Sequence, residues 1–315
     1  MIYSEVIIVG GGPAGSTCAR ELKQHGVECL ILDKEEFPRT KLCAGWITPK
    51  VIQDLKIDIA AYPYSLITFN RLHIRVFGIP LKIKTRQYAI RRYEFDNWLL
   101  KRSQVPACKH FVKDIREEKG FYIIDNYYRC RYLIGAGGTA CPVYRTYFRE
   151  ANPRDKKSLL VTLEEECICA YKDENCYLWF FENKLPGYAW YIPKGNGCLN
   201  VGIGGFWEGL KARRDNIRNH WNIFTEKLAA LSLVKNYNFD PQGHVYYQRN
   251  NIRKARVDNV FIIGDAVGLA TKDFGEGIGP AVESGLLAAR AIVNSSNFSL
   301  DSIGKYSIFR VLSSR

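Results

Sequence analysis

The sequence predicts an α/β fold in which a discontinuous, Rossmann-like nucleotide-binding domain carries an inserted antiparallel β-sheet domain. An apolar strand at residues 6–9 runs into a glycine-rich turn and a helix close to the N-terminus. A second apolar strand at residues 260–263 runs into another glycine-rich turn and helix close to the C-terminus. Between them, residues 159–205 are rich in the aromatic and β-branched residues that are typical of strands.

The glycine-rich turn near the N-terminus has the parts of a dinucleotide-binding unit in the right order. Gly10 is expected to allow the tight turn, Gly12 the approach of the backbone to a pyrophosphate, and Gly15 close packing of helix on strand. A helix over residues 14–25 and a second strand follow, and Asp33 ends that strand where a ribose hydroxyl binds. The residues predicted to hold the nucleotide are Gly10, Gly12, Pro13, Ala14, Gly15, Asp33 and Lys34.

The glycine-rich turn near the C-terminus follows a buried strand. Asp265, at the end of this strand, can accept hydrogen bonds from sugar-like hydroxyls, and the glycines let the backbone approach a flat ligand. Strand–turn–helix units with glycines are common in α/β proteins, so this turn alone is compatible with a purely structural role. The N-terminal unit favours ligand binding. The residues predicted to contact the ligand here are Gly264, Asp265, Gly275, Gly277 and Ile278.

The remaining segments complete the two predicted domains. Helices are predicted at residues 49–55, 91–100, 207–219 and 220–231, and strands at residues 66–88, 108–116, 120–125 and 129–135. The sequence contains no internal repeat or flexible linker, so the β-rich part is expected to dock on the nucleotide domain. The predicted nucleotide domain comprises residues 1–65, 88–158 and 245–315, and the β-rich substrate domain comprises residues 66–87 and 159–244.

Composition predicts a globular protein with a basic surface. The formal net charge is +13, from 45 Lys and Arg against 32 Asp and Glu. These basic residues are scattered, which fits a solvated surface, an acidic lipid or a diphosphate, and no nucleic-acid motif is present. No apolar run approaches the ~20 residues that span a bilayer. With ten cysteines and no export signal, we expect a cytoplasmic protein, with membrane association as a further possibility.

At this point the sequence resembles a known family. Gly10–Gly15 with Asp33, Arg92 to Asp96, and Gly264-Asp265 stand in the order found in flavoproteins of the p-hydroxybenzoate hydroxylase type. Within that superfamily the chain is most similar to the geranylgeranyl reductase branch. The branch pattern is Tyr-x-Trp-x-Phe-Pro, seven or eight residues, then Gly-x-Gly. Here residues 188–193 read Tyr-Ala-Trp-Tyr-Ile-Pro, and eight residues separate them from Gly-Ile-Gly at residues 202–204.

The resemblance implies an FAD-binding domain of the glutathione reductase type. It assigns Asp265 to the ribityl chain, Arg92 to the linker or phosphate region, and Val112 to adenine through its backbone in a strand. For Arg92, a surface pair with Glu94 or solvent is the alternative. The loop Cys43-Ala44-Gly45 resembles the branch's cysteine–glycine loop beside the flavin.

The resemblance also implies a reaction. The chain is expected to reduce C=C bonds of a prenyl or other hydrophobic substrate, with hydride from reduced flavin and a proton from water or a nearby side chain. Cys43 is a tentative catalytic residue, with packing as a small hydrophobe as the alternative. Tyr188 and Trp190 are expected to form the wall of an apolar trough, with Gly202 and Gly204 leaving room for the substrate; a β-sheet core packed with aromatics is the alternative.

Other functions of the same superfamily stay open. Residues 187–193 also resemble the halogenase Gly-Trp-x-Trp-x-Ile-Pro signature, and a flavin monooxygenase or an electron-transfer dehydrogenase is a further alternative. Gly137-Gly138 stands where the wider family has Asp-Gly, so we expect slow reduction by NADPH and a ferredoxin-like electron-donor protein. Cys167 and Cys169 lack a second ligand pair, so packing on one strand face is expected and no metal site is predicted.

Overall fold

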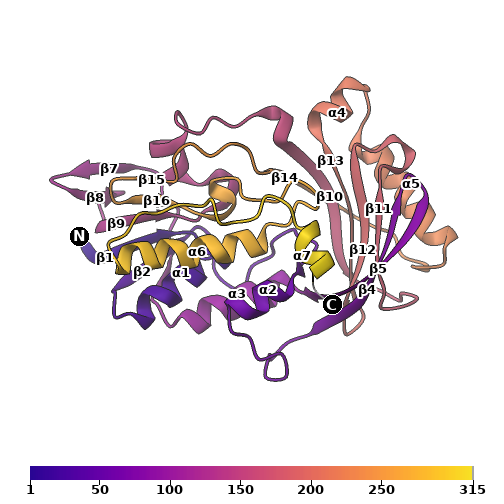
Figure 1. Cartoon of the computed structure of the whole chain (residues 1–315), viewed down its shortest axis with the longest axis horizontal. Coiled ribbons are helices and arrows are strands. Elements are labelled where there is room, and N and C mark those ends of the chain that lie inside the picture. Colours follow the sequence, from indigo (N-terminus) through magenta and orange to yellow (C-terminus); the bar gives the residue numbers. More distant parts are fainter. Residues whose placement is uncertain (314–315) are drawn as a thin grey trace. The chain divides into compact units, whose positions relative to one another are not determined.

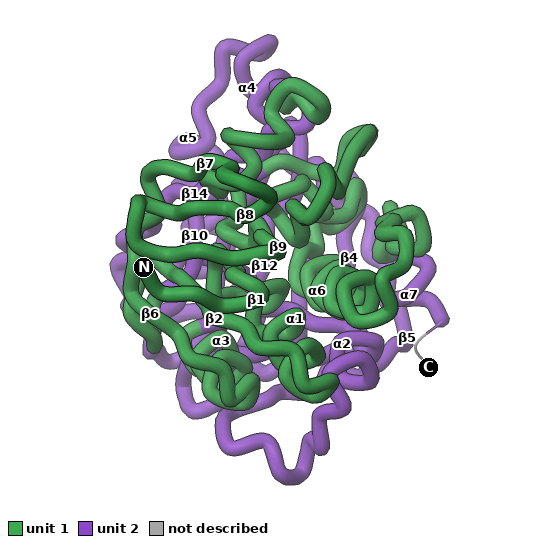
Figure 2. The backbone as a smooth tube through the Cα atoms, turned by 90° about the vertical axis from the view of Figure 1, so that its left-hand side faces the viewer, with its two compact units in different colours: residues 1–39, 93–154, 247–307 green, residues 40–92, 155–246, 308–315 purple. Residues whose placement is uncertain are grey.

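The computed structural model describes residues 1–313, which form two compact units. Unit 1 consists of residues 1–39, 93–154 and 247–307, and unit 2 of residues 40–92, 155–246 and 308–315 (Figure 2). Unit 1 contains β1 (Ile2–Val9), α1 (Pro13–Gln24), β2 (Cys29–Asp33), α3 (Arg92–Ser103), β6 (Ala107–Lys109), β7 (Ile115–Glu118), β8 (Phe121–Ile124), β9 (Tyr128–Gly135), β15 (Arg256–Val257), β16 (Val260–Ile262) and α6 (Ile278–Val293). Unit 2 contains β3 (Trp46–Ile47), α2 (Pro49–Asp54), β4 (Leu66–Val76), β5 (Ile79–Ile90), β10 (Leu159–Ile168), β11 (Cys176–Phe180), β12 (Gly187–Gly195), β13 (Cys198–Phe206), α4 (Trp207–Ala212), α5 (Ile217–Ala230), β14 (Gln242–Tyr247) and α7 (Ile308–Ser313).

The sheet of unit 1 has a parallel centre. Its strand order is β15-β16-β9-β1-β2-β6, and β8 and β7 continue from β9. All neighbours from β16 to β6 are parallel, whereas β15, β7 and β8 pair antiparallel. Residues 6–9 are buried on both faces of β1, which explains why the strand is continuously apolar. Figure 1 shows α1 and α6 lying side by side along this sheet.

Backbone contacts hold the start of α1 against the C-terminal part of unit 1. A Cβ atom added at Gly285 of α6 would lie 2.5 Å from the carbonyl oxygen of Ala14. A Cβ atom at Gly264 would lie 3.1 Å from the Cβ of Ala14, and Gly264 has a φ of +61°. The two predicted glycine-rich turns therefore belong to one packed unit.

The sheet of unit 2 is mixed, with the order β14-β10-β13-β12-β11-β4-β5-β3. Its strands pair antiparallel from β10 through β11 and again from β4 to β3, but β11 and β4 are parallel. The predicted purely antiparallel sheet is wrong at this one pair, because β4 comes from an early segment of the chain whose direction relative to β11 no local pattern encodes. One face of the sheet packs against Trp221, Phe224 and Leu228 of α5.

The compact units differ from the predicted domains at five segments. Residues 40–65, 88–92, 155–158, 245–246 and 308–313 were expected with the nucleotide domain but belong to unit 2. Trp46 pairs with Ala89 of β5, and the hydroxyl of Thr85 on β5 donates to the carbonyl of Val311 in α7. These contacts draw both segments to the second sheet; residues 314–315 of the predicted range lie outside the described residues.

Two predicted elements have different bounds. The strand predicted at residues 108–116 is two short strands, β6 and β7, joined by a loop that contains Val112. In this loop the carboxylate of Asp125 accepts hydrogen bonds from the backbone of Lys113 (3.2 Å) and Asp114 (2.8 Å), which replaces the pairing a strand would need. The helices predicted at 207–219 and 220–231 are α4 and α5, separated by a turn before Ile217.

Within residues 1–313, none of the helices has both the length and the apolar character needed to cross a membrane.

Replacing Gly285 by Ala is expected to destabilise the protein by about 1–3 kcal/mol, because the new methyl group would overlap the carbonyl oxygen of Ala14. Chemical denaturation measures this. Gly243→Ala is the matched control, since a Cβ atom there meets no atom closer than 3.8 Å. Equal stability of the two variants would show that α1 and α6 are less tightly packed than described.

Candidate cofactor and substrate sites

The glycine-rich turn before α1 is shaped by two close backbone contacts and one open position. Gly10 has a φ of +116°, and a Cβ atom there would lie 2.4 Å from the carbonyl oxygen of Ala136. A Cβ atom at Gly15 would lie 1.9 Å from the carbonyl oxygen of Gly10. At Gly12 the only atom within 4 Å of such a Cβ is Nη2 of Arg39, at 3.5 Å. Only Gly12 therefore leaves room for a ligand against the backbone at the helix start.

Asp33 holds this turn through its carboxylate. Its Oδ2 accepts from the backbone N–H of Gly11 at 2.7 Å, and its Oδ1 accepts from Glu35 at 2.9 Å. Lys34 is exposed and lies 3.7 Å from Glu35, so it shows no contact with the turn. Val112 is buried in the loop after β6, not in the strand that was predicted for it.

Arg39 is a candidate phosphate-binding residue that the sequence analysis missed. Its guanidinium lies beside Gly12, 4.7 Å above the ring of Phe37, and pairs with the fully buried carboxylate of Asp96 at 3.1 Å. A guanidinium fixed next to a helix start is suited to a pyrophosphate. Its sequence signal was weak, because Arg39 stands in a loop without a period and Asp96 lies far away in the chain.

The turn after β16 presents a buried acceptor that lacks a partner among the described residues. Oδ1 of Asp265 is buried and accepts no hydrogen bond there. A Cβ atom added at Gly277 would lie 3.1 Å from this oxygen, so the backbone at the start of α6 stands directly beside it. An unsatisfied buried carboxylate oxygen is costly, and a hydroxyl-bearing ligand would satisfy it. This orphan acceptor and the open backbone at Gly12 fit an FAD molecule.

Arg154 connects the glycine-rich turn after β9 with the turn that carries Asp265. Its Nη1 donates to the carbonyl of Thr139, and its Nη2 donates to the carbonyl of Ala266 at 3.4 Å. The guanidinium also lies 3.9 Å above the ring of Tyr144. Arg154 thus holds the turn at Gly137 and Gly138, where an Asp-Gly pair was expected from the wider family.

In unit 2, Trp190 fills the space that was expected to admit a substrate. Trp190 is 4% exposed, and its Nε1 donates to Oδ1 of Asn200 at 2.7 Å. A Cβ atom at the facing Gly202 would lie 2.1 Å from the indole ring, and one at Gly204 would lie 3.6 Å from it. The predicted opening above Gly202 is therefore wrong, because the indole of the opposite strand occupies it. Tyr188 is half-buried and stacks on Phe180 at 4.7 Å, so it remains a candidate wall residue.

The same strands hold the loop that contains Cys43. Nδ2 of Asn200 lies 3.5 Å from the carbonyl oxygen of Cys43, and the ammonium of Lys194 donates to the carbonyls of Ala44 and Ile90, the latter at 2.9 Å. Gly45 has a φ of +63°, and a Cβ atom there would lie 2.3 Å from Nζ of Lys194. Asn200 of β13 and Lys194 of β12 thus hold the Cys43 loop against the sheet.

Glu164 is a buried acid on the sheet face that bears Trp190, and the sequence analysis missed it. Both residues are cross-strand partners of Gly202, which puts their side chains on one face. Burial raises the pKa of the Glu164 carboxyl to about 7, against the opposing effect of nearby Lys194 and Lys41. Burial also lowers the pKa of the Lys194 ammonium. The signal was available in β10, where three successive glutamates interrupt an apolar strand.

Arg92 belongs to this charged group. Burial, followed by the positive charges of Lys41 and Arg92, lowers the pKa of His244 to about 4. His244 is therefore neutral and accepts a hydrogen bond from Lys41 at 2.8 Å. Arg92 also opposes the raised pKa of Glu164, so it stands close to both groups. Glu166, on the same strand as Glu164, pairs with Arg91 at 2.9 Å.

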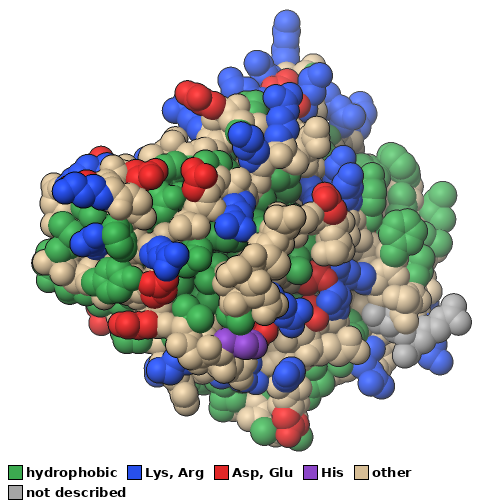
Figure 3. All heavy atoms as spheres, turned by 60° about the vertical axis from the view of Figure 1, so that its left-hand side comes forward, with side chains coloured by type: hydrophobic (Ala, Val, Ile, Leu, Met, Phe, Trp, Pro, Cys, Tyr) green, Lys and Arg blue, Asp and Glu red, His purple; other side chains and the backbone are tan. Residues whose placement is uncertain are grey.

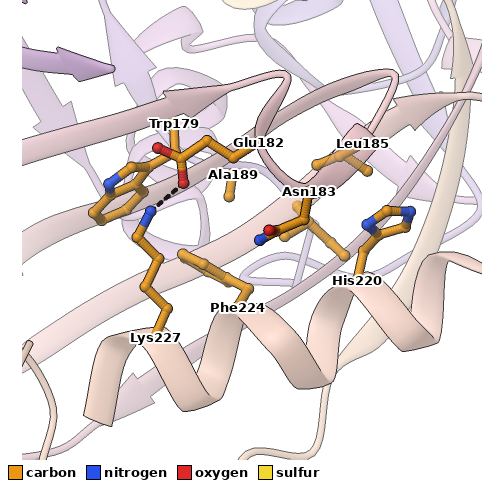
Figure 4. A pocket seen from close by; sticks show the side chains of 9 residues that line it. Trp179, Glu182, Asn183, Leu185, Ala189, His220, Phe224 and Lys227 are labelled. Atoms are coloured by element: carbon orange, nitrogen blue, oxygen red, sulfur yellow. Dashed lines mark hydrogen bonds and ion pairs between the residues drawn. The ribbon is translucent and has the colours of Figure 1, made fainter. Parts of the chain in front are cut away.

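A small pocket lies on the opposite face of the sheet, between the strands and α5. Figure 4 shows Trp179 and Ala189 facing Phe224 and His220, with Glu182 and Lys227 paired at one side. A cavity of about 20 Å³ holds roughly one water molecule. It is too small for a lipid chain, and we assign it to the packing of α5.

The ten cysteines are free. Sγ of Cys167 lies 3.3 Å from Sγ of Cys169, so the two side chains share one side of the strand. Within residues 1–313, His, Cys, Asp and Glu side chains form no group of three or more with the arrangement of a metal site.

The sulfur of Cys43 accepts a hydrogen bond from the backbone N–H of Gly45 at 3.3 Å.

The chain is similar in sequence to known flavin-binding proteins. Residues 3–53 match the family described as FAD binding domain. The chain is 25% identical over 330 residues to digeranylgeranylglycerophospholipid reductase 2 of Methanosphaera stadtmanae, covering 97% of this chain and 82% of that protein. It is 26% identical over 339 residues to the menaquinone reductase of Mycolicibacterium smegmatis, covering 92% and 76% respectively.

Solved structures share the fold. A geranylgeranyl bacteriochlorophyll reductase-like protein of Thermoplasma acidophilum superposes with a TM-score of 0.81 at 21% identity, covering 94% of this chain and 79% of that one. A flavin-dependent brominase superposes with a TM-score of 0.74 at 18% identity, covering 98% and 82%. The predicted resemblance and the predicted cofactor are confirmed: the chain is an FAD-dependent oxidoreductase, and it is similar to a protein named as a digeranylgeranylglycerophospholipid reductase.

Replacing Asp265 by Ala is expected to weaken FAD binding roughly 10- to 100-fold, the range for a lost hydrogen bond to a charged group. The flavin-to-protein absorbance ratio after gel filtration measures this. Asp301→Ala, an exposed acid in the same unit, is the control and keeps its flavin. Full flavin retention by a folded Asp265→Ala protein would contradict the assignment of this carboxylate.

Glu164 is expected to make stability fall as pH rises. Its pKa is about 7 in the folded protein against an ordinary 4.5, so the unfolded chain releases this proton first and stability is lost between those values. Glu164→Gln removes this dependence and is expected to gain up to about 3 kcal/mol at pH 8 relative to wild type. Denaturation midpoints from pH 4 to 8 measure it, with exposed Glu226→Gln as control. Parallel curves for wild type and Glu164→Gln would contradict the raised pKa.

Proposed function

We propose that the protein reduces C=C bonds in the prenyl chain of a lipid. The observation that carries this proposal is the character of one face of the sheet in unit 2. Aromatic and aliphatic side chains cover it across β11 and β12, and a single buried acid with a pKa near neutrality, Glu164, lies beside them. Two relatives are named for lipids, one for a digeranylgeranyl glycerophospholipid and one for menaquinone.

We assign cofactor binding to residues of unit 1, as an FAD domain of the glutathione reductase type. Gly12, with Pro13 and Ala14 at the helix start, and Arg39 would hold the diphosphate, and Asp33 the adenosine ribose. Asp265 would hold the ribityl chain. The N–H groups of Gly277 and Ile278, with Gly275 before them, would face the flavin pyrimidine edge, where a helix start favours negative charge. When bound, FAD supplies the hydride for the reduction.

Glu164 is our candidate for the proton donor. Reduction of a C=C bond adds a hydride to one carbon and a proton to the other, so the site needs an acid that is protonated near pH 7. The carboxyl of Glu164 would give its proton to the second carbon, become a carboxylate, and regain a proton from water. Lys194 and Lys41 would stabilise that carboxylate between turnovers. Tyr188 would contact the apolar chain.

Three further assignments from the sequence remain proposals. Cys43, with Ala44 and Gly45, would contact the flavin, and the loop's fixed carbonyls support a positioning role for Lys194. Arg92 would balance the charge of Glu164 instead of binding phosphate directly. The electron donor would be a small redox protein, since the turn at Gly137 is held by Arg154 and offers no aspartate to place a nicotinamide.

A second candidate function is flavin-dependent oxygenation or halogenation. The likeness to a brominase fold and the run at residues 187–193 favour it. In this chain, however, Trp190 is buried as a support for the Cys43 loop, and Glu164 provides an acid that a reductase uses.

Anaerobic reoxidation separates the two functions. Enzyme reduced by dithionite is expected to be reoxidised by a geranylgeranyl lipid without oxygen. Glu164→Gln is expected to slow this reoxidation at least tenfold, because a general acid typically contributes about 10²–10⁴-fold to the rate. Stopped-flow absorbance of the flavin measures both rates. Exposed Glu226→Gln is the matched control. Reoxidation that occurs only when oxygen and a halide or aromatic substrate are present would favour the second candidate.

A further inference from the structure

The hairpin of β4 and β5 exposes large apolar side chains at its tip. Phe77 is 72% exposed, Ile79 65% and Leu81 48%. Phe181, which follows the neighbouring strand β11, is 40% exposed and stacks on Phe77 with ring centroids 5.1 Å apart. Single exposed apolar residues are normal on a protein surface, but four large ones gathered at one hairpin indicate an interaction site.

The apolar residues of the hairpin share one face of the sheet. Ile79 pairs with Val76, and Leu81 pairs with Ile74. The side chains of these two cross-strand pairs therefore point to the same side of the sheet. Val76 in turn pairs with Phe180, whose other partner is Tyr188. Ile79 and Leu81 are therefore the outer end of the apolar face on which we place the lipid chain.

The opposite face of the same hairpin is basic. Arg71 pairs with Lys84, His73 with Lys82, and Arg75 with Pro80, which puts the Arg and Lys side chains on the other side from Ile79. Arg71, Arg75, Lys82, Lys84 and Arg86 are all exposed. Residues 66–90 contain no Asp or Glu. The nearest acid to Phe181 in the sequence, Glu182, is paired with Lys227.

We infer that the β4–β5 hairpin docks on the surface of a bilayer that contains anionic lipids. Phe77, Ile79, Leu81 and Phe181 would enter the boundary between headgroups and acyl chains, and the basic side chains would contact lipid phosphates. Charge complementarity carries this choice, because an exposed apolar tip on a hairpin whose other face is rich in Lys and Arg fits an acidic interface. On the molecular face in Figure 3, Lys and Arg side chains are spread among apolar ones, which accords with a general attraction to acidic surfaces.

The inference deepens the proposed function, on which it rests for its purpose, since a lipid substrate must be taken from a membrane. The docking surface itself is argued from exposure, register and charge. A protein that binds vesicles but reduces no prenyl lipid would retain the docking surface and lose the proposed function. A protein that reduces detergent-dispersed prenyl lipid but ignores vesicles would retain the function and lose the docking surface.

Vesicle sedimentation with the full chain tests the inference. Wild type is expected to bind vesicles of phosphatidylcholine mixed with phosphatidylglycerol, and to bind less at high salt and to phosphatidylcholine alone. Lys82→Gln and Lys84→Gln are each expected to weaken binding to the acidic vesicles about fivefold. The double variant Phe77→Ser and Ile79→Ser is expected to weaken binding to both kinds of vesicle.

Matched controls use equally exposed residues elsewhere. Phe111→Ser, at a position 58% exposed in unit 1, and the exposed pair Lys156→Gln and Lys157→Gln are expected to bind vesicles like wild type. All variants are checked for flavin content and thermal midpoint, which should not change. Lys82→Gln and Lys84→Gln, on the opposite face from the apolar residues, are also expected to reduce detergent-dispersed lipid like wild type. Absence of vesicle binding by wild type, or equal losses in the hairpin and control variants, would overturn the inference. So would hairpin-dependent binding to another protein without vesicle binding.

Discussion

Contact of backbone against backbone at the start of α1 is the constraint on which unit 1 depends. Ala14 meets Gly264 on one side and Gly285 on the other, at distances that leave no room for a side chain. This contact joins the turn that opens the chain to the turn that carries Asp265. The result is one rigid frame in which the helix-start N–H groups and an unsatisfied carboxylate oxygen are held ready, and a cofactor with both phosphates and hydroxyls can satisfy them.

In unit 2 a buried cation, Lys194, holds a loop against the sheet through backbone carbonyls. The ammonium of Lys194 is fully buried, and such a charge persists only when carbonyl or carboxylate oxygens surround it. Ala44 and Ile90 supply carbonyls, while Glu164 and Glu166 supply negative charge nearby. The loop at Cys43 is thereby tied to the sheet. Burial raises the pKa of Glu164 to about 7 and the charge of Lys194 opposes that rise, so one network both positions a loop and tunes an acid.

One face of the second sheet changes character from one edge to the other. Around β10 and β13 it is polar and charged, at β11 and β12 it is aromatic, and at the tip of β4 and β5 it is aliphatic and exposed. Alternation along each strand separates this face from the packed side under α5 and from the basic side of the hairpin. A graded face of this kind suits a long amphiphilic molecule, because its polar and apolar parts find matching surroundings in sequence.

The sequence by itself determined the local structure and the cofactor. Glycines at 10, 12 and 15, the apolar strands beside them and Asp33 encode backbone conformations that depend on few distant contacts. The strands and the helix of this unit formed within a few residues of their predicted bounds. Tertiary structure alone decided what depends on neighbours across a sheet. The parallel pairing of β11 with β4, the burial of Trp190 over Gly202, the approach of Arg39 to Gly12 and the shifted pKa of Glu164 each join residues far apart in the chain. Burial and charge are properties of that assembled surrounding, and no spacing along one strand carries them.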